Sequence, residues 1–216
     1  MTKGVSGSAR PIARRYLRDA FDTAIPESVG FPQSVDEDRV RLVGAMLERR
    51  IQTLKTSSCR RLFEAVASLI RMRSVVSFEG QAAMRLEAIA ADDVRDGYEF
   101  AIVGERLAQL DMRPMVRQSV SDVVRDASAG VMAARPHNTL VSVVRVMCVR
   151  RREELSLARV CLSDGCFQNA RLPHGSAEGL RTDGFEVLFH RVIPSNDGGI
   201  SVREAAIACE LVQRGL

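Results

Sequence analysis

The chain has 216 residues, of which 46% are hydrophobic and 27% are charged. This length suffices for one buried domain or two small lobes, and this composition excludes a chain that is disordered throughout. No apolar stretch approaches the roughly 20 residues that a membrane span needs, and no charged-then-apolar leader opens the chain. We therefore expect a cytoplasmic protein that has no membrane partner.

The net charge of +4 is carried almost entirely by arginine, because lysine occurs only at Lys3 and Lys55. Arginine suits planar contacts with carboxylate and phosphate, but here the arginines are mixed with acids and tryptophan is absent. A solvated mixed-charge surface explains this pattern better than a nucleic-acid interface, so we expect no nucleic-acid partner. The five cysteines are an odd number without a C-x-x-C pair, which favours reduced thiols over disulfides or a thiolate zinc site.

Helical patterns dominate the N-terminal part of the chain. Residues 1–9 are small and polar, and we expect a flexible terminus there. Apolar residues at helical spacing predict helices over 12–21 and 34–52. Two more helices are predicted, one after the hydroxyl-rich turn 56–58 and one after 79–80. Polar side chains at these two helix starts suit a ligand, although helix capping explains them equally well.

Strands and longer helices follow. Alternating apolar residues predict strands over 98–103 and 107–112, paired as a hairpin. Helical spacing then predicts helices over 116–127 and 130–155. We find no internal repeat or linker, and we therefore predict a single domain over residues 10–216.

Two strand-turn-helix units end the chain, over 160–169 and from 186 to the C-terminal helix. Each has a short apolar run that ends in small polar and glycine residues just before a helical pattern. Such turns leave backbone N–H groups free at a helix start, and glycine lets a phosphate approach the backbone closely. Tight turns without a ligand have the same signature, so the pattern leaves both interpretations open.

Five ordered segments carry a resemblance to a known family. They are TSSCRRLFEAV at 56–66, FEGQAAM at 78–84, HNTL at 137–140, SDGCFQN at 163–169 and PSNDGGI at 194–200. In this order they resemble the carbamoyltransferase HypF family, which matures the active site of NiFe hydrogenases. The similarity extends from about Arg10 to the C-terminus.

The resemblance implies an α/β fold of the actin-like ATPase (ASKHA) type, with a mixed sheet flanked by helices. Specifically, it implies the C-terminal portion of the TsaD-like domain of HypF. Family members make carbamoyl adenylate from carbamoyl phosphate and ATP, and pass the carbamoyl group to the C-terminal cysteine of HypE. ATP, magnesium or a transition metal, carbamoyl phosphate and a HypE-type acceptor are therefore the implied cofactors and partners.

HypF proteins carry further domains and a paired-histidine metal motif that we do not find in this sequence. A separate chain that carries the missing half is therefore a further expected partner. We expect the chain alone to make no carbamoyl adenylate.

The family pattern also implies site residues, although it assigns no catalytic residue. Asp197 matches the superfamily's metal ligand. The acids Glu64 and Glu79 correspond to residues near the ribose in related proteins. The implied nucleotide-binding residues are Ser163, Asp164, Gly165, Asn169, Glu64, Glu79, Gly198 and Gly199.

Some positions depart from the family pattern. Asp164 stands where the family has glycine, and a carboxylate about 4 Å from a phosphate charge costs roughly 4 kcal/mol at an effective dielectric of 20, close to a thousandfold in affinity. Arg60 replaces a second glycine, which adds bulk but also a cation that attracts phosphate. Glu64 replaces the usual aspartate. We expect weak nucleotide binding unless Asp164 turns outward or shares a cation with the phosphates.

The remaining metal-ligating and nucleophilic side chains favour structural roles. We expect His137 to be a polar helix residue, and His174 and His190 to be surface residues rather than metal ligands. Cys166 is expected to be a structural thiol. Asp197 alone does not make a transition-metal site, so the other ligands would come from another segment.

Two functional hypotheses follow, and whether the chain is an enzyme by itself stays open. The first is a HypF-type carbamoyltransferase fragment or truncated homologue. The alternative is a non-catalytic remnant that acts as a binding or assembly module, through an apolar side that the absent half-domain would otherwise cover.

Overall fold

The computed structural model describes residues 9–21, 42, 45–46, 49, 51, 58–70, 78, 80–104 and 108–215. By internal contacts the chain divides into two units, Met1–Thr139 and Leu140–Leu216. Residues 1–8 and most of the predicted helix over 34–52 lie outside the described residues. The prediction of a single domain over 10–216 stays a prediction.

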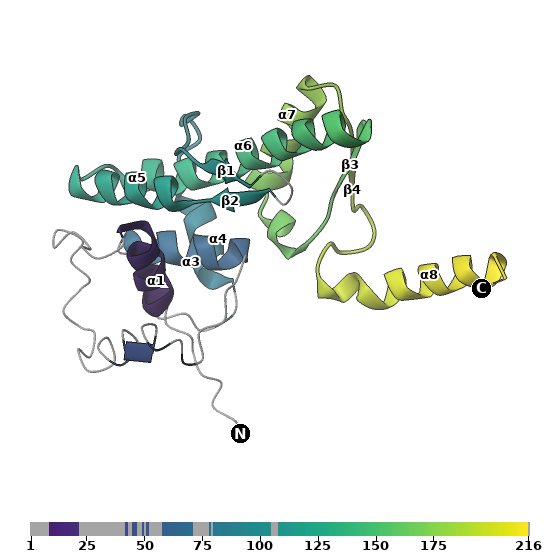
Figure 1. Ribbon diagram of the computed structural model, residues 1–216, viewed down its shortest axis with the longest axis horizontal. Coiled ribbons are helices and arrows are strands. Elements are labelled where there is room, and N and C mark those ends of the chain that lie inside the picture. The colour runs from purple at the N-terminus through teal and green to yellow at the C-terminus, as the bar shows by residue number, and fades with distance from the viewer. Residues whose placement is uncertain are drawn as a thin grey trace. The chain divides into compact units, whose positions relative to one another are not determined.

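The first unit is mainly helical, with α1 (Ala9–Phe21), α3 (Cys59–Leu69), α4 (Gln81–Ile89) and α5 (Arg113–Val124). These helices confirm the predictions made from the apolar spacing of the sequence, because apolar residues three and four positions apart form one buried stripe on each helix. Figure 1 shows α1 beside α3. The core that α1, α3 and α5 share contains Ala13, Leu17, Ala20, Ala65, Leu69, Val116 and Val120.

The helix starts differ from the predicted caps. Ser58 occupies the N-cap position of α3, and its side chain makes no capping hydrogen bond, so the cap predicted for the turn 56–58 does not come from Ser58. The other two residues of that turn, 56 and 57, lie outside the described residues. Gly80 is the N-cap of α4 with φ 81°, a left-handed conformation that favours glycine. The chain geometry therefore accounts for Gly80 without a ligand.

The predicted hairpin is confirmed, although its strands are shorter than the sequence predicts. β1 (Ala101–Val103) pairs antiparallel with β2 (Gln109–Asp111). The first strand starts late because the backbone N–H groups before it donate to side chains. The N–H of Tyr98 donates to Oγ1 of Thr139 at 2.7 Å, and the N–H of Glu99 donates to Oε1 of Gln118 at 2.7 Å.

A buried polar cluster holds α5 and α6 (Ala129–Leu155) together within the first unit. Asp122 accepts hydrogen bonds from the Tyr98 hydroxyl at 2.7 Å and from Nη1 of Arg135 at 2.6 Å. Burial, together with the hydrogen bond to Asp122, raises the pKa of Tyr98 well above its usual range. Tyr98 therefore stays protonated and the buried carboxylate keeps its partners.

The second unit contains β3 (Arg159–Leu162), α7 (Arg171–Thr182), β4 (Glu186–Phe189) and α8 (Ile200–Gln213). The last turns of α6 also belong to it. β3 pairs parallel with β4, from Arg159 opposite Glu186 to Leu162 opposite Phe189. α7 makes the crossover that parallel pairing requires. Leu162, Leu180 and Phe185 form the core of this unit.

The two sheets correct one part of the predicted fold. The α/β class is confirmed, but the described residues form two separate two-stranded sheets and not one mixed sheet. The physical reason is that the hairpin β1 and β2 pairs locally in the first unit, whereas β3 and β4 pair with each other in the second.

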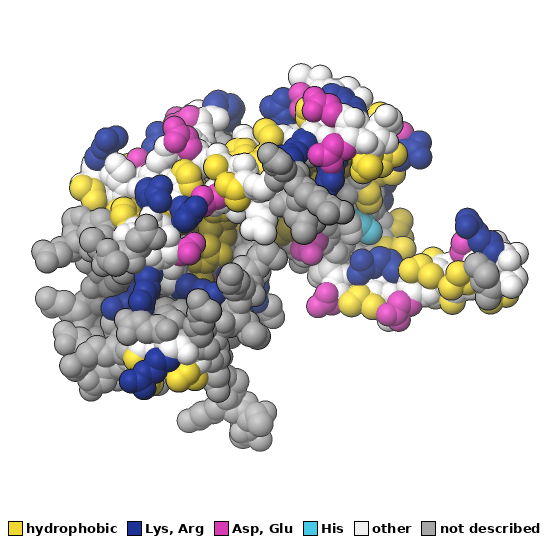
Figure 2. Space-filling model, in the orientation of Figure 1, with side chains coloured by type: hydrophobic (Ala, Val, Ile, Leu, Met, Phe, Trp, Pro, Cys, Tyr) yellow, Lys and Arg dark blue, Asp and Glu magenta, His cyan; other side chains and the backbone are white. Residues whose placement is uncertain are grey.

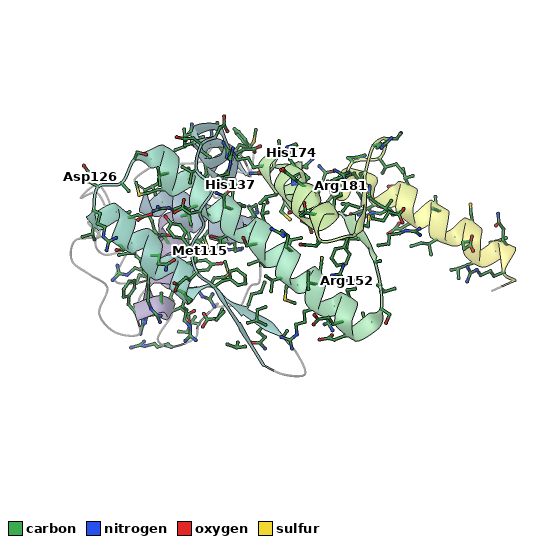
Figure 3. All side chains as sticks on the ribbon, turned by 90° about the horizontal axis from the view of Figure 1, so that it is seen from above. Met115, Asp126, His137, Arg152, His174 and Arg181 are labelled. Carbon is green, nitrogen blue, oxygen red and sulfur yellow. The ribbon has the colours of Figure 1, made fainter. Side chains whose placement is uncertain are left out.

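The helices α6 and α7 approach each other closely in the second unit. A Cβ added at Gly179 would lie 2.2 Å from Cδ of Arg145, and one added at Gly175 would lie 3.0 Å from Cγ2 of Val141. Asp183 holds Arg145 in place with two hydrogen bonds, of 2.9 and 2.8 Å. Arg152, near the end of α6 in Figure 3, donates to the Asp183 carbonyl oxygen at 2.6 Å. The glycines of α7 therefore serve helix packing.

The C-terminal helix α8 buries none of its side chains against the described residues. Several of its aliphatic residues are exposed, including Val212 at 75% and Ile207 at 61%. Hydrophobic side chains lie along this helix in Figure 2. Within the described part of the chain, no helix has the length and apolar character that would span a membrane.

Candidate functional site

The two glycine-lined turns of the second unit lie side by side. The first follows β3 and continues into the short helix η1 (Gly165–Gln168), and the second follows β4 and continues into η2 (Asp197–Gly199). The N–H of Asp164 donates to the carbonyl oxygen of Ser195 at 3.2 Å, which joins the two turns. A Cβ added at Gly165 would lie 3.9 Å from Cβ of Asn196. The turns that the sequence singles out therefore meet at the carboxyl ends of two paired strands.

Each turn is closed by an acidic or amide side chain that binds its own backbone. Oδ1 of Asp164 accepts from the N–H of Cys166 at 3.0 Å, and Oδ1 of Asn196 accepts from the N–H of Gly198 at 3.0 Å. Both are the two-residue pattern of an Asx turn. The carboxylate of Asp164 thus takes up an amide that a bound phosphate would otherwise use.

The backbone of Asp164 is in a conformation that favours glycine. Its φ is 123° and its ψ is 159°, a region that residues with a Cβ rarely occupy and that costs about 1–3 kcal/mol. This is the position at which the family pattern has glycine. The aspartate therefore strains the turn as well as adding a charge to it.

Gly199, the second glycine after Asp197, is required by the loop itself. A Cβ at Gly199 would lie 2.4 Å from the carbonyl oxygen of Pro194, which is a clash with backbone. The N–H of Gly199 donates to the carbonyl oxygen of Asn196 at 3.0 Å. By contrast, the N–H groups of Gly165 and Asp197 meet no acceptor among the described residues. Both residues are exposed, so these amides are available to a ligand.

Asn169 caps the helix that follows the first turn. Its Oδ1 accepts from the N–H groups of Arg171 at 3.1 Å and Leu172 at 3.3 Å, at the start of α7. This contact orients α7 relative to the turn. Its predicted role in nucleotide binding stays a prediction, because capping accounts for its carbonyl group.

Of the two predicted ribose-side acids, the structure describes Glu64 but not Glu79. Glu64 belongs to α3 in the first unit, where its Oε1 accepts from Nη1 of Arg60 at 3.1 Å. Glu64 is largely buried, with 12% of its side chain exposed. Arg60 and Glu64 are both departures from the family pattern, and they pair with each other one helical turn apart. Glu79 lies outside the described residues.

Asp197 is exposed at the start of η2. Among the described residues, no three His, Cys, Asp or Glu side chains gather as a possible metal site. One carboxylate does not fit a transition metal, so the residues described do not by themselves make a metal centre.

The three histidines lie in different environments. His137, in the middle of α6 in Figure 3, is buried, and its Nδ1 donates to the Ala133 carbonyl oxygen at 2.7 Å. His174 is exposed, as predicted. His190 is half-buried, and its Nε2 lies 2.8 Å from Oγ of Ser163. His190 therefore lies only partly at the surface, and its ring also contacts Ser163.

The contact between His190 and Ser163 was not predicted from the sequence. The signal was present, because Ser163 directly follows one strand and His190 directly follows the other. Only the register, with Leu162 opposite Phe189, shows that the next residue of each strand forms a pair.

Comparisons with known proteins decide the family. The family profile described as "Carbamoyltransferase, Kae1-like Domain, second subdomain" matches residues 6–202. The chain belongs to the carbamoyltransferase HypF family.

Individual HypF proteins agree with this assignment. Carbamoyltransferase HypF of Synechocystis sp. is 32% identical over 156 residues, covering 71% of this chain and 20% of the relative. HypF of Rhizobium leguminosarum bv. viciae is 33% identical over 171 residues, covering 78% of this chain and 22% of the relative. The chain therefore spans about a fifth of the length of these two HypF proteins.

A solved structure shares the fold of this HypF-family chain. The crystal structure of full-length HypF in the phosphate- and nucleotide-bound form has a TM-score of 0.85 and 36% sequence identity. The match covers 94% of this chain and 27% of that chain. The described fold is therefore that of a HypF segment.

Proposed function

We propose that this chain is the nucleotide-facing part of a HypF-type carbamoyltransferase. In this proposal, the two joined turns of the second unit bind the phosphates of ATP. Carbamoyl phosphate would be hydrolysed with release of phosphate, and its carbamoyl group would react with ATP to form carbamoyl adenylate with release of pyrophosphate. The carbamoyl group would then pass to the C-terminal cysteine of a HypE-type protein with release of AMP. The chain spans only about a fifth of the two HypF relatives, so the rest of the machinery would come from a segment or chain not described here.

The observation that carries the proposal is the hydrogen bond from the Asp164 N–H to the Ser195 carbonyl oxygen. It brings the two glycine-lined turns together at the carboxyl ends of parallel strands, where ligands of α/β proteins bind. The matched solved HypF was crystallised with phosphate and nucleotide, which supports a nucleotide ligand for a chain of this fold.

Three donors define the proposed phosphate site. They are the N–H groups of Gly165 and Asp197, which meet no acceptor in the described structure, and the hydroxyl of Ser163 at the base of the first turn. Fixed donors of this kind stabilise the negative charge that phosphoryl and adenylyl chemistry develops. Asp197 would then contribute one carboxylate to a magnesium ion or a transition metal, and the other ligands would come from elsewhere.

A second candidate function is a non-catalytic binding or assembly module. Two observations favour it: the strained carboxylate of Asp164 within the phosphate-binding turn, and the exposed aliphatic side chains of α8. Under this alternative the family site has decayed, and the chain persists because it binds another protein.

Calorimetry and a pyrophosphate assay separate the two candidates. We expect the purified 216-residue chain to bind ATP and magnesium weakly and to release no pyrophosphate when carbamoyl phosphate is added. Failure of both the wild type and Asp164→Gly to bind ATP would favour the module. Robust pyrophosphate release by the chain alone would contradict the view that it is an incomplete enzyme.

A further inference from the structure

His190 and Ser163 form a polar contact at the base of the proposed phosphate site. They directly follow β4 and β3, whose last paired residues are Phe189 and Leu162. Equivalent positions on neighbouring parallel strands present their side chains to the same side of the sheet. The resulting distance between Nε2 of His190 and Oγ of Ser163 is 2.8 Å, and the contact is partly buried.

The contact lies at the base of the joined turns. Ser163 is followed at once by Asp164 and Gly165, and the N–H of Asp164 is bonded to the second turn. His190 precedes that second turn in the chain. A side chain that fixes Ser163 therefore acts at the point from which both turns leave the sheet.

The direction of this hydrogen bond decides what Ser163 can do. A serine hydroxyl has one proton, and an imidazole nitrogen either donates or accepts. If Nε2 carries a proton, it donates to Oγ of Ser163, and the serine proton remains for another acceptor. If Nε2 is bare, the serine donates to it and presents only lone pairs outward. An anion needs the first arrangement.

We propose that His190 is a positioning residue whose Nε2–H holds the Ser163 hydroxyl as a donor toward a bound phosphate group. The inference rests on the proposed nucleotide function and adds a residue that acts only through Ser163. His190 itself makes no contact with the ligand. The opposite arrangement, in which His190 accepts the serine proton, would instead make Ser163 a nucleophile with an adjacent base.

A double-mutant cycle tests this dependence. ATP with magnesium would be titrated calorimetrically at pH 8 into Ser163→Ala, His190→Ala and the double variant, each in the wild type and in the Asp164→Asn background, which removes the charge from the turn. Because a hydrogen bond to a charged group is lost, each single change should weaken binding about tenfold to a hundredfold. The double variant should bind as weakly as either single one.

Two further variants separate positioning from a structural role. His190→Gln keeps an N–H donor at a similar reach and should restore most of the affinity. His174→Ala removes the exposed histidine of α7 and should leave the affinity unchanged. Thermal unfolding of every variant shows whether the fold is intact. Additive losses from Ser163→Ala and His190→Ala, or no rescue by His190→Gln in a folded protein, would overturn the proposal.

A ligand-independent measurement keeps the inference separate from the proposed function. The ring nitrogens of His190, observed by ¹⁵N nuclear magnetic resonance at pH 8, report which nitrogen carries the proton. We expect protonated Nε2. A bare Nε2 would overturn the inference even if ATP binds. Protonated Nε2 without ATP binding in either background would refute the nucleotide function, and with it the phosphate role of His190.

Discussion

Replacing Asp164 with glycine tests the proposed phosphate site most directly. The substitution removes a residue whose φ of 123° favours glycine, and the strain it relieves is about 1–3 kcal/mol. It also removes the exposed hydrogen bond to the Cys166 N–H, worth about 1 kcal/mol, and loosens the unfolded chain by about 0.5–1 kcal/mol. These terms nearly cancel, so we expect the free energy of unfolding to change by less than about 1 kcal/mol.

The effect of Asp164→Gly on nucleotide affinity should be much larger. Two unit charges about 4 Å apart repel by about 1 kcal/mol in water and about 4 kcal/mol at an effective dielectric of 20. Asp164 is exposed, which places the effect toward the lower part of this range. We therefore expect ATP to bind about tenfold to a hundredfold more tightly, as measured by calorimetry with magnesium present.

Two companion variants identify the cause of any gain. Asp164→Asn keeps an Asx-turn acceptor but removes the charge, so equal gains from Asn and Gly assign the effect to charge. Asp126 also has a positive φ, of 55°, but lies after α5 in the first unit, at the position labelled in Figure 3. Asp126→Gly should leave ATP affinity unchanged. Unaltered affinity in both Asp164 variants would refute the assignment of the first turn to phosphate.

Three further predictions concern the packing of the helices. Gly179→Ala should destabilise the fold by about 1–3 kcal/mol in chemical denaturation, because the added Cβ meets the side chain of Arg145. Adding Arg145→Ala to this variant should recover part of the lost stability. An undiminished loss in the double variant would argue against the contact. The hydrogen bonds from Arg145 lower the pKa of Asp183 in the folded protein, so the stability they confer is present above the unfolded pKa near 3.8 and is lost as the pH falls through the lower folded pKa. Asp183→Asn should therefore reduce the loss of unfolding free energy at acid pH, as measured by urea titrations at several pH values. An unchanged pH dependence would contradict this prediction. The buried Oγ of Ser176 meets no hydrogen-bond partner among the described residues, whereas that of Ser119 donates to the Met115 carbonyl oxygen. Ser176→Ala should therefore be neutral or stabilising by about 1 kcal/mol while Ser119→Ala destabilises, and the reverse order of melting temperatures would be incompatible with this difference.

Local pattern predicted α1, α3, α4 and α5 because each of these helices follows its own apolar spacing. Ala13, Leu17 and Ala20 recur at three- and four-residue intervals and are all buried in the core of the first unit. The same reasoning found the hairpin. It missed the late start of β1, since the donors of Tyr98 and Glu99 are captured by Thr139 and Gln118, which are distant in sequence.

The turns of the candidate site were predictable from glycine and polar residues, but their internal bonding was not. Sequence alone gave no sign that Gly199 is needed because the Pro194 carbonyl oxygen approaches it, or that Asn169 caps α7. The contact between His190 and Ser163 depends on the register of two strands separated by a helix. Long-range register is set by how the whole unit packs, which a local pattern does not contain.

Arg60 and Glu64 show how two departures can be understood together. Considered alone, each substitution only disrupts a family motif. In the structure they form a partly exposed ion pair one turn apart on α3, worth about 0.3–0.5 kcal/mol. The pair therefore supports the helix locally.

The bare surface of α8 bears on how long the protein survives in a cell. Chaperones and proteases of the cellular quality-control system recognise proteins by their exposed hydrophobic segments. Ile207 and Val212 of α8 are exposed, so this helix offers chaperones and proteases a hydrophobic segment to bind. A copy in which these side chains stay exposed should therefore be cleared faster than one in which they are buried.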